Sequence, residues 1–359
     1  MADAPDEIVL TVAGRAHRGW TRAEVQTGID SAADQFTLEL TERYPGQPER
    51  QVIAAGAEAT IAVGGEPLIA GYIDRITVNL SGEDRILTIT GRSKAADLID
   101  CSAVATPGSW RNRSLEAIAA EIAQPFGISV TAKASTAPVF KAFAIEPGET
   151  AYAAIERMCK LRGLLPISDA QGNLTITRPE PLGDPVELKQ GVDILAIDAS
   201  HDVSERFSEY RIKGQARGDD DANGRAVAHA KGSASDPGVT RMRPLLIVAD
   251  GNIDSAAAKR RAEWEASVRA ARAQSIVVTR AGWRESGDGR SGALWAKSRR
   301  VRIDAEAVFV QGEMLVANVA FMIANETGRT VALTCANPKA YAPEPVPEEA
   351  KASRIGGAA

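Results

Sequence analysis

The sequence predicts a β-rich α+β protein in which two strand-rich blocks flank a smaller block of helices and strands. Residues 7–100 and much of 181–340 contain short runs of alternating apolar and polar side chains, separated by turn residues. Residues 101–180 instead contain two stretches with the apolar spacing of a helix. A chain of 359 residues, 44% hydrophobic and 25% charged, can bury a sizeable core and is long enough for about two to three domains.

The first block covers residues 1–100. Residues 8–12 and 36–40 alternate apolar side chains with polar or small ones, which is typical of half-buried strands. Gly64-Gly65 is a signal for a two-residue hairpin turn, and residues 81–84 mark the next turn. This pattern predicts a small antiparallel barrel or sandwich. The block is acidic, with 16 Asp and Glu against 9 Lys and Arg.

The middle block, residues 101–180, contains two helix signals. Ser114 can cap a helix that ends at Pro125 and Gly127. A second helix begins near Thr150 and ends at Gly163. The following GLLPISDAQGNLTITR predicts a strand, a turn and a strand, so this block is expected to be an α+β domain.

The last block, residues 181–340, returns to strands, of which SEYRIKGQ is the clearest. We expect a long loop over 216–240, because this stretch is rich in Gly, Asp, Ala and Ser. A helix over about 254–273, capped by Asp254 or Ser255, follows it. Further strands are predicted in SIVVTRAGW, SRRVRIDA, GEMLVANVAFMIA and GRTVALTCA. Residues 341–359 are rich in Pro, Ala and Glu and are expected to be disordered.

Two stretches are candidates for ligand or catalytic sites. Gly91-Arg92-Ser93 ends a predicted strand but lacks the two glycines and the Lys-Ser/Thr of a phosphate-binding loop, which favours a backbone corner. Cys101 would need a histidine base close in space, and His17, His201 and His229 are scattered along the chain. We therefore expect Cys101 to be a small buried side chain.

Metal and cofactor sites have no support in the residue pattern. Cys101, Cys159 and Cys335 form no CxxC pair and are expected to be reduced packing thiols. Asp219-Asp220-Asp221 is consecutive, whereas calcium loops use alternating ligand positions, so it is expected to be a solvated loop tip. The sequence analysis therefore predicts no catalytic, cofactor-binding or metal-binding residue.

Charge is unevenly distributed. The net charge of −5 argues against a general nucleic-acid binder, yet residues 253–303 hold 12 Lys and Arg against 5 Asp and Glu. The clusters are Lys259-Arg260-Arg261 and Arg299-Arg300 with Arg302. They indicate either a solvated helix face and an edge strand whose charges prevent pairing with other chains, or an electrostatic contact with an acidic neighbour. No secretion signal and no uncharged apolar run near 18 residues is visible in the sequence.

Several stretches, in order, resemble the baseplate hub proteins of Mu-like contractile-tailed phages, which are related to the late-control D proteins and to the hub part of type VI secretion spikes. The resemblance covers about residues 5–340. The stretches are GEPLIAGYIDRI, LTITGRSKAADLIDCSA, SLEAIAAEIAQPFGISV, GETAYAAIERMCKLRGLLPISDAQGNLTITR, SERFSEYRIKGQ, RRAEWEASVRAARAQSIVVTRAGW and EMLVANVAFMIANETGRTVALT.

The resemblance implies two small antiparallel β-barrel domains, at 1–100 and 181–340, flanking an α+β middle domain at 101–180. It implies that the loop and helix at about 216–274 interrupt the second barrel and that the helix packs on the middle domain. The implied function is a homotrimeric ring that adapts a six-fold tail tube to a three-fold membrane-piercing spike. The ring leaves an axial channel for DNA, and the acidic first block would suit such a channel.

The same resemblance implies which partners to expect. They are the tail spike protein, the tail tube or tube-initiator protein, and other baseplate proteins, with assembly in the host cytoplasm into the tail baseplate of a virion. It implies no enzymatic activity, no sequence-specific nucleic-acid binding and no membrane insertion. The alternatives are the hub of a phage-derived injection machine and a tail-associated peptidoglycan-degrading enzyme.

Overall fold

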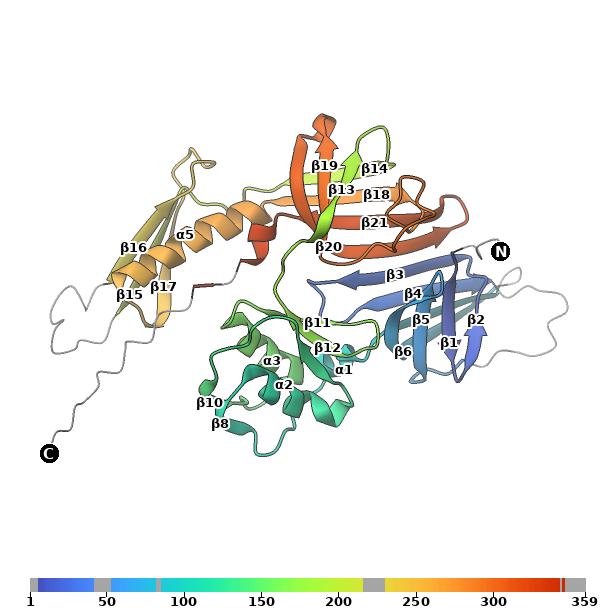
Figure 1. Cartoon of the computed structure of the whole chain (residues 1–359), viewed down its shortest axis with the longest axis horizontal. Helices are drawn as coiled ribbons and strands as arrows, with labels where there is room; N and C mark the ends of the chain where they lie inside the picture. The colour runs from blue at the N-terminus through green and yellow to red at the C-terminus, as the bar shows by residue number, and fades with distance from the viewer. Residues whose placement is uncertain (1–5, 42–52, 82–84, 216–229, 343, 346–359) are drawn as a thin grey trace. The chain divides into compact units, whose positions relative to one another are not determined.

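The computed structural model describes residues 6–41, 53–81, 85–215, 230–342 and 344–345, and Figure 1 shows the order of the helices and strands along the chain. The chain divides into two compact units. The first unit comprises Met1–Ala199 and Ser275–Ala336, and the second comprises Ser200–Gln274 and Asn337–Ala359. The prediction of a β-rich α+β fold is confirmed.

The first strand-rich block has the predicted alternation. Its strands are β1 (Ile8–Val12), β2 (Arg15–His17), β3 (Arg22–Gly28), β4 (Gln35–Thr41), β5 (Glu58–Val63), β6 (Glu66–Leu80) and β7 (Arg85–Ser93). Every second side chain of β1 is buried, which gives the strand one core face. Gly64 and Gly65 join β5 to β6 with φ of 56° and 83°, the positive values that a tight hairpin turn needs.

The middle block has its own core. Its elements are α1 (Ala95–Asp100), β8 (Ser109–Arg113), α2 (Leu115–Ala123), η1 (Gln124–Phe126), β9 (Val130–Ala132), β10 (Phe140–Ala144), α3 (Ala151–Lys160), β11 (Leu165–Ser168) and β12 (Leu174–Thr177). The predicted caps are confirmed, because Ser114 Oγ accepts from Ala117 N at 3.3 Å and Thr150 Oγ1 accepts from Ala153 N at 3.2 Å. The buried faces of α2 and α3 share one cluster with Leu174 of β12.

The second strand-rich block joins the sheet of the first. Its elements in the first unit are β13 (Leu182–Lys189), β14 (Ala196–His201), β18 (Gln274–Ala281), β19 (Arg299–Ala305), η2 (Glu306–Val308), β20 (Val310–Ala324) and β21 (Gly328–Ala336). Strand β20 pairs antiparallel with β3, from Asn318 opposite Gly28 to Ala324 opposite Arg22. Apart from β15, β16 and β17 of the second unit, the described strands of the two blocks, thirteen in number, belong to one sheet. Its order is β14-β18-β21-β20-β3-β4-β7-β6-β5-β1-β2, with β19 attached beside β20 and β13 beside β19.

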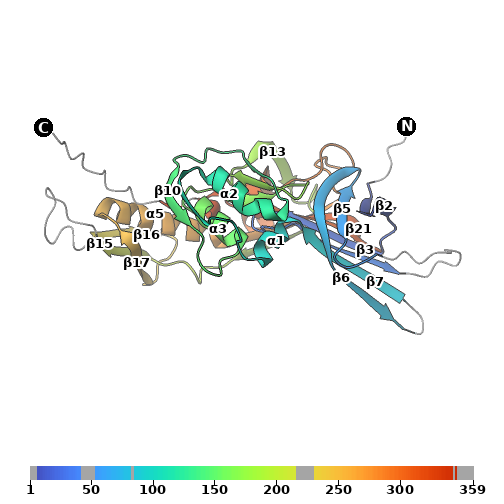
Figure 2. The same cartoon turned by 90° about the horizontal axis from the view of Figure 1, so that it is seen from below.

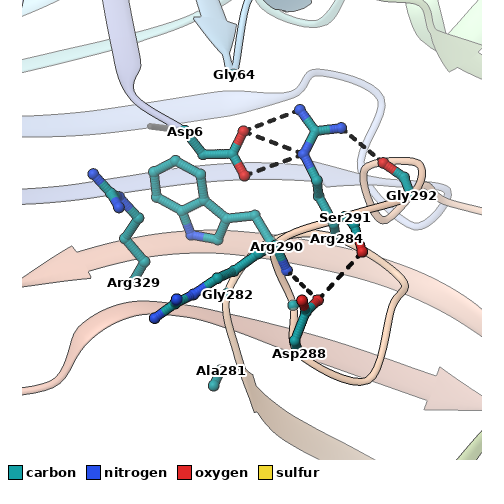
Figure 3. Close-up of a pocket in the computed structure, with 12 residues that line it drawn as sticks. Asp6, Gly64, Ala281, Gly282, Arg284, Asp288, Arg290, Ser291, Gly292 and Arg329 are labelled. Atoms are coloured by element: carbon teal, nitrogen blue, oxygen red, sulfur yellow. Dashed lines mark hydrogen bonds and ion pairs between the residues drawn. The ribbon is translucent and has the colours of Figure 1, made fainter. Parts of the chain in front are cut away.

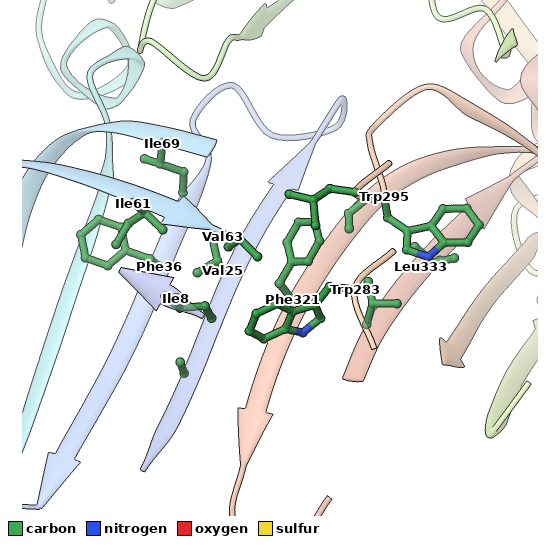
Figure 4. Close-up of a cluster of buried hydrophobic side chains, with 14 of the residues drawn as sticks. Ile8, Val25, Phe36, Ile61, Val63, Ile69, Trp283, Trp295, Phe321 and Leu333 are labelled. Atoms are coloured by element: carbon green, nitrogen blue, oxygen red, sulfur yellow. The ribbon is translucent and has the colours of Figure 1, made fainter. Parts of the chain in front are cut away.

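The buried side chains of the two blocks form one core. Figure 4 shows Ile8, Val25 and Phe36 of the first block in the same cluster as Trp283 and Phe321 of the second. These thirteen strands form one open sheet and no closed barrel, because neither end strand, β14 or β2, pairs with a second described strand. The two separate barrels implied by the resemblance are not confirmed. The sequence pattern identified the strands and their buried faces, while the pairing of β3 with β20 was not predicted.

A buried ion pair lies where the two blocks and the middle block meet. Lys297 Nζ is 3.1 Å from both carboxylate oxygens of Asp34 and donates to the carbonyl oxygen of Ser168 at 2.7 Å. The Asp34 side chain is 1% exposed and also accepts from Gly28 N at 3.1 Å. The backbone of Asp34 accepts from Ser93 N at 2.8 Å. Burial raises the pKa of Asp34, and the Lys297 charge and the hydrogen bonds oppose that rise.

The second unit is a three-stranded sheet covered on one face by a long helix. Its elements are β15 (Glu209–Gln215), β16 (Ala230–Ser235), β17 (Pro244–Asn252), α5 (Ser255–Arg272) and η3 (Pro338–Tyr341), and the strand order is β16-β15-β17. Asp254 is the cap of α5, since its Oδ1 accepts from Ala257 N at 2.6 Å. Gly232 of β16 allows the strand to approach α5 closely, because a Cβ there would clash with the backbone of Ala258 and Lys259.

Two expectations for this region need correction or lie outside the described residues. The loop expected over 216–240 is wrong for its second part, because Ala230–Ser235 is strand β16. Its small side chains gave no apolar alternation, and the pairing with β15 supplies the order instead. Residues 216–229 lie outside the described residues, as does most of the tail predicted from residue 341. The expected packing of the helix on the middle domain stays a prediction.

We expect that Lys297→Met lowers the free energy of unfolding by about 3–5 kcal/mol, because it leaves the Asp34 carboxylate buried without its cation. Urea unfolding followed by the fluorescence of the buried Trp283 and Trp295 measures the loss. The double variant Asp34→Asn/Lys297→Met should lose less, since it carries no uncompensated charge.

The loss in Lys297→Met should also depend on pH. Because the pKa of Asp34 is higher in the folded protein than in the unfolded chain, the unfolded chain loses this proton first as pH rises. The free energy of unfolding therefore falls as pH rises from the unfolded pKa to the folded pKa. The deficit of the variant should therefore shrink in acid, where Asp34 is protonated. A deficit below about 1 kcal/mol at neutral pH would contradict the role of this ion pair.

Candidate functional site

The candidate site is the uncovered polar face of the long sheet. The path from β14 through β18, β21, β20, β3, β4 and β7 to β6 contains eight strands. Directly opposed side chains of antiparallel strands share a face, so the registers define which residues lie on the side away from the core. They include Gln26, Gln35, Thr37, Thr77, Asn79, Ile86, Thr88, Thr90, Val277, Thr279, Ala320, Met322, Thr330, Ala332 and Thr334, and all except the buried Thr330 are half-buried or exposed. This face, which we call the polar face, is dominated by small and uncharged side chains.

The charges on the polar face nearly balance. Arg22, Glu24, Glu39, Arg75 and Arg92 belong to the same registers, and Arg22 lies directly opposite Glu39. The acidic excess of the first block was expected to suit a channel. The polar face of the described strands does not carry that excess.

At both ends of the eight-strand path, part of β6 and the outer edge of β14 have no pairing partner among the described strands. Strand β5 pairs with β6 only over Glu66 to Tyr72, so no described strand pairs with residues 74–80 on the edge away from β7. Figure 2 shows the β6–β7 hairpin projecting past β5. Val78 and Leu80 on this edge are 47% and 78% exposed. At the other end, β14 has β18 as its one neighbour among the described strands.

A hollow of about 1000 Å³ lies where β5–β6 meets the loop after β18 (Figure 3). Arg284 is at its centre and contacts Asp6 at 3.0 Å, Glu66 at 3.1 Å and the carbonyl oxygen of Gly292 at 2.8 Å. The positive charge of Arg284 is therefore neutralised by Asp6 and Glu66 of the first strand-rich block. Gly64 lies beside it with φ of 56°, a conformation that favours glycine, and a Cβ there would displace the Asp6 carboxylate and the Arg284 guanidinium. We interpret this ion pair as a structural link between the two blocks.

The stretch around Gly91 forms a corner between β7 and α1. A Cβ on Gly91 would clash with the carbonyl oxygen of Tyr72 and the ring of Phe36. Arg92 of β7 links β6 to α1 at this corner. Its Nε lies 2.7 Å from Asp74 Oδ2, and its Nη2 lies 2.7 Å from Asp100 Oδ2. The hydrogen bond from Arg92 lowers the pKa of Asp100. The geometry supports the interpretation of this stretch as a backbone corner.

The cysteines differ from one another in exposure. Cys159 and Cys335 are buried, and burial raises the pKa of each thiol to about 12. Cys101 was expected to be buried, and this is wrong, because it is exposed. It is the residue after α1, and its backbone is held by Asp97 and Ala151 while its side chain faces outward. The pattern that predicted the helix end did not indicate the direction of this side chain.

The other candidates are dispersed. His17 is buried in β2 and His201 is exposed at the end of β14, whereas His229 and Asp219-Asp220-Asp221 lie outside the described residues. In the described part of the chain, no three or more His, Cys, Asp or Glu side chains group as metal ligands would. No helix there is long and apolar enough to cross a membrane.

The basic clusters are largely paired with carboxylates of the same chain. Arg299 contacts Glu285 at 2.7 Å, and Arg302 contacts Glu187 at 2.9 Å and Glu313 at 2.6 Å. On α5, Lys259 lies 3.9 Å from Glu263, and Arg261 contacts both Glu265, at 2.8 Å, and Glu344. This pairing favours the solvated helix face and the charged edge strand over a contact with an acidic neighbour.

Three family models match the chain in succession. Residues 7–93 match the N-terminal domain of the Mu phage baseplate assembly protein GpP-like family, and residues 95–178 match the second domain of the baseplate hub protein gp44-like family. Residues 254–344 match the fourth domain of Mu phage baseplate assembly protein GpP. The baseplate hub protein gp44 of Escherichia phage Mu is 34% identical over 329 residues, which cover 89% of this chain and 85% of that protein.

The chain belongs to the family of Mu-type baseplate hub proteins. The resemblance inferred from the sequence is thereby confirmed, and the hub protein is a structural component of a phage tail baseplate. Among solved structures, the 43 kDa tail protein of prophage MuSo2 from Shewanella oneidensis is 30% identical, with a TM-score of 0.82 over 93% of this chain and 99% of that one.

More distant structures share the fold. The tail protein from Neisseria meningitidis MC58 is 23% identical, with a TM-score of 0.78 over 95% of this chain and 99% of that one. An E. coli type VI secretion component is 10% identical, with a TM-score of 0.56 over 94% of this chain and 79% of that one.

We expect a thiol reagent to label the folded hub protein at Cys101 alone, and all three cysteines after unfolding, because only Cys101 is exposed. Mass spectrometry of the labelled peptides gives the result. Cys101→Ala should change the free energy of unfolding by less than about 0.5 kcal/mol, as an exposed substitution does. Rapid labelling of Cys159 or Cys335 in the folded protein would contradict the burial assigned to them.

Proposed function

We propose that three copies of the hub protein form a ring whose axial channel is lined by the polar face. The pairing of β3 with β20 within the chain carries this proposal, since it already joins the two strand-rich blocks side by side. In the ring, the open edge of β6 in one copy would pair with the open edge of β14 in the next. Such pairing would satisfy the backbone groups of both edges, which otherwise invite uncontrolled association.

The proposed ring has a width suited to DNA. Eight strands from each of three copies make 24 strands, and a spacing of about 4.8 Å gives a circumference of about 115 Å and a backbone diameter of about 37 Å. Inward side chains occupy about 5 Å on each side, half the distance between packed sheets, which leaves about 27 Å. Any tilt of the strands would widen the ring further. A channel of this width admits a DNA duplex.

The composition of the polar face would suit passage of DNA without binding it. Proteins hold DNA chiefly through Lys and Arg contacts to phosphates, and those contacts are sparse on this face. Arg22 is opposite Glu39, and Arg92 is bound by Asp74 and Asp100. Hydroxyl and amide groups would keep the channel hydrated without a strong field of either sign.

We further propose the division of the chain and its partners. Residues 1–100 and 181–340 are the two barrel-like domains, the latter interrupted at about 216–274, and residues 101–180 are the middle domain. Three copies would present six such domains to a six-fold tail tube or tube-initiator protein, and the opposite end of the ring would hold the trimeric spike. Other baseplate proteins would bind around the ring. We propose no catalytic residue and no cofactor, and a role in a phage tail or a phage-derived injection machine fits equally.

We expect the double variant Val78→Lys/Leu80→Lys to be monomeric at concentrations where the unmodified protein is a trimer. Both side chains are exposed in the single chain, so the substitutions should leave its fold intact while charging the proposed pairing edge. Light scattering measures the mass. The matched control is Val248→Lys on β17, which is 72% exposed in the second unit and should remain trimeric.

The result decides the proposal. A double variant that stays trimeric would show that the β6 edge lies outside the ring contact. An unmodified protein that forms a stable dimer would contradict the ring itself.

A further inference from the structure

Phe309 is an exposed aromatic side chain in an unfavourable backbone conformation. It follows η2 in the turn between β19 and β20, with φ of 58° and ψ of 36°. This left-handed region is normally occupied by Gly or Asn, because a Cβ crowds the neighbouring carbonyl oxygen. The Phe309 side chain is also 87% exposed. The chain therefore bears both backbone strain and an exposed ring at this position, with little contact inside the fold in return.

The turn is held rigidly. Val310 beside Phe309 is fully buried, and Val308 packs against the core of the sheet. Ala307 N donates to Oε1 of Gln190 at 3.2 Å, and Gln190 N donates to the carbonyl oxygen of Asp304 at 3.0 Å. The Phe309 ring is thus presented on a fixed backbone, which reduces the entropy lost on binding a partner.

A second exposed apolar side chain lies in the adjoining turn. Val192 is two residues beyond Gln190 and is 74% exposed. Asp304 and Glu306 place exposed carboxylates in these two turns. Asp304 accepts a hydrogen bond from Gln311 Nε2 at 3.0 Å and lies opposite the exposed Lys189 in the register of β13 with β19. The surface therefore combines an apolar centre with a net negative surround of two carboxylates and one lysine. We call these residues, Val192, Asp304, Glu306 and Phe309, the acidic knob.

We propose that the acidic knob docks another tail protein, which offers an apolar pocket surrounded by Lys and Arg side chains. The charges are complementary in that arrangement, and a rigid aromatic anchor in an apolar pocket is the usual centre of a protein interface. Strain persists at functional positions where the conformation serves binding. The proposal rests on the hub role of the chain in a baseplate, and the exclusion of a neighbouring copy as the occupant also uses the proposed ring.

A ring neighbour is a poor occupant. The hollow of Figure 3 lies near Arg329, beyond the end of β20, whereas Phe309 immediately precedes its start. Copies related by rotation in one ring share the same height, so opposite ends of a long strand do not meet between them. The Arg284 charge in that hollow is also already satisfied by Asp6 and Glu66. A different protein of the tail is therefore the occupant.

The test is Phe309→Gly in the full chain. Glycine relieves the left-handed strain, so the thermal midpoint should be unchanged or slightly higher, and light scattering should show an unchanged oligomer. In cells that assemble the tail from the variant, complete tails counted by electron microscopy should fall at least tenfold. Val192→Ser should lower the count as well.

The matched control is Ala13→Gly, which relieves a similar positive φ of 49° in the exposed turn between β1 and β2. It should raise or preserve the thermal midpoint and leave the tails normal. Normal tails with Phe309→Gly would overturn the proposal. Loss of the oligomer would identify a second copy as the occupant and overturn it too, and a lower thermal midpoint would assign Phe309 a role inside the fold. The ring proposal is tested separately on β6, so the two failures are distinguishable.

Discussion

The antiparallel pairing of β3 with β20 is the interaction on which the rest of the structure depends. It pairs strands that are separated by most of the chain, and so joins the two strand-rich blocks into one sheet with a common core and a continuous polar face. The Asp34–Lys297 ion pair reinforces the same junction and adds the middle block through Ser168. Pairing of this range closes a very long loop, and the entropy of that closure must be recovered by the many contacts that follow it.

Local features of the sequence were enough to identify most elements of this fold. The alternation in residues 8–12, the glycine pair at 64–65 and the caps at Ser114 and Thr150 correspond to a strand, a hairpin and two helix starts in the structure. Each of these signals acts over a few residues, through side-chain direction, positive φ or a capping hydrogen bond. The resemblance to a family, carried by ordered stretches, supplied the function that these signals could not.

The parts that were missed depend on contacts between distant residues. Alternation specifies which face of a strand is buried and leaves its neighbour open, so the β3–β20 pairing could not be read from either strand. Strand β16 has small side chains without alternation, and it is ordered by β15 and by the close approach at Gly232. The polar face is visible in the sequence only as scattered Thr and Gln residues until the registers align them.

Electrostatics in this protein serves mainly to join its own elements. Carboxylates of the same chain bind Arg284, Arg299 and Arg302. Most of the positive charge late in the sequence is therefore neutralised by ion pairs within the chain. The surfaces left for assembly are instead strand edges and exposed apolar side chains. This division fits the proposed ring, in which strand edges would face neighbouring copies and a nearly neutral face would line the channel.

Electron cryo-microscopy of the purified ring tests the central claim most directly. We expect three copies around one axis and a 24-stranded inner wall in which β6 of each copy pairs with β14 of the next. The side chains of Thr37, Thr90 and Ala320 should face the channel. A ring with another number of copies, or one in which this face lies away from the axis, would contradict it.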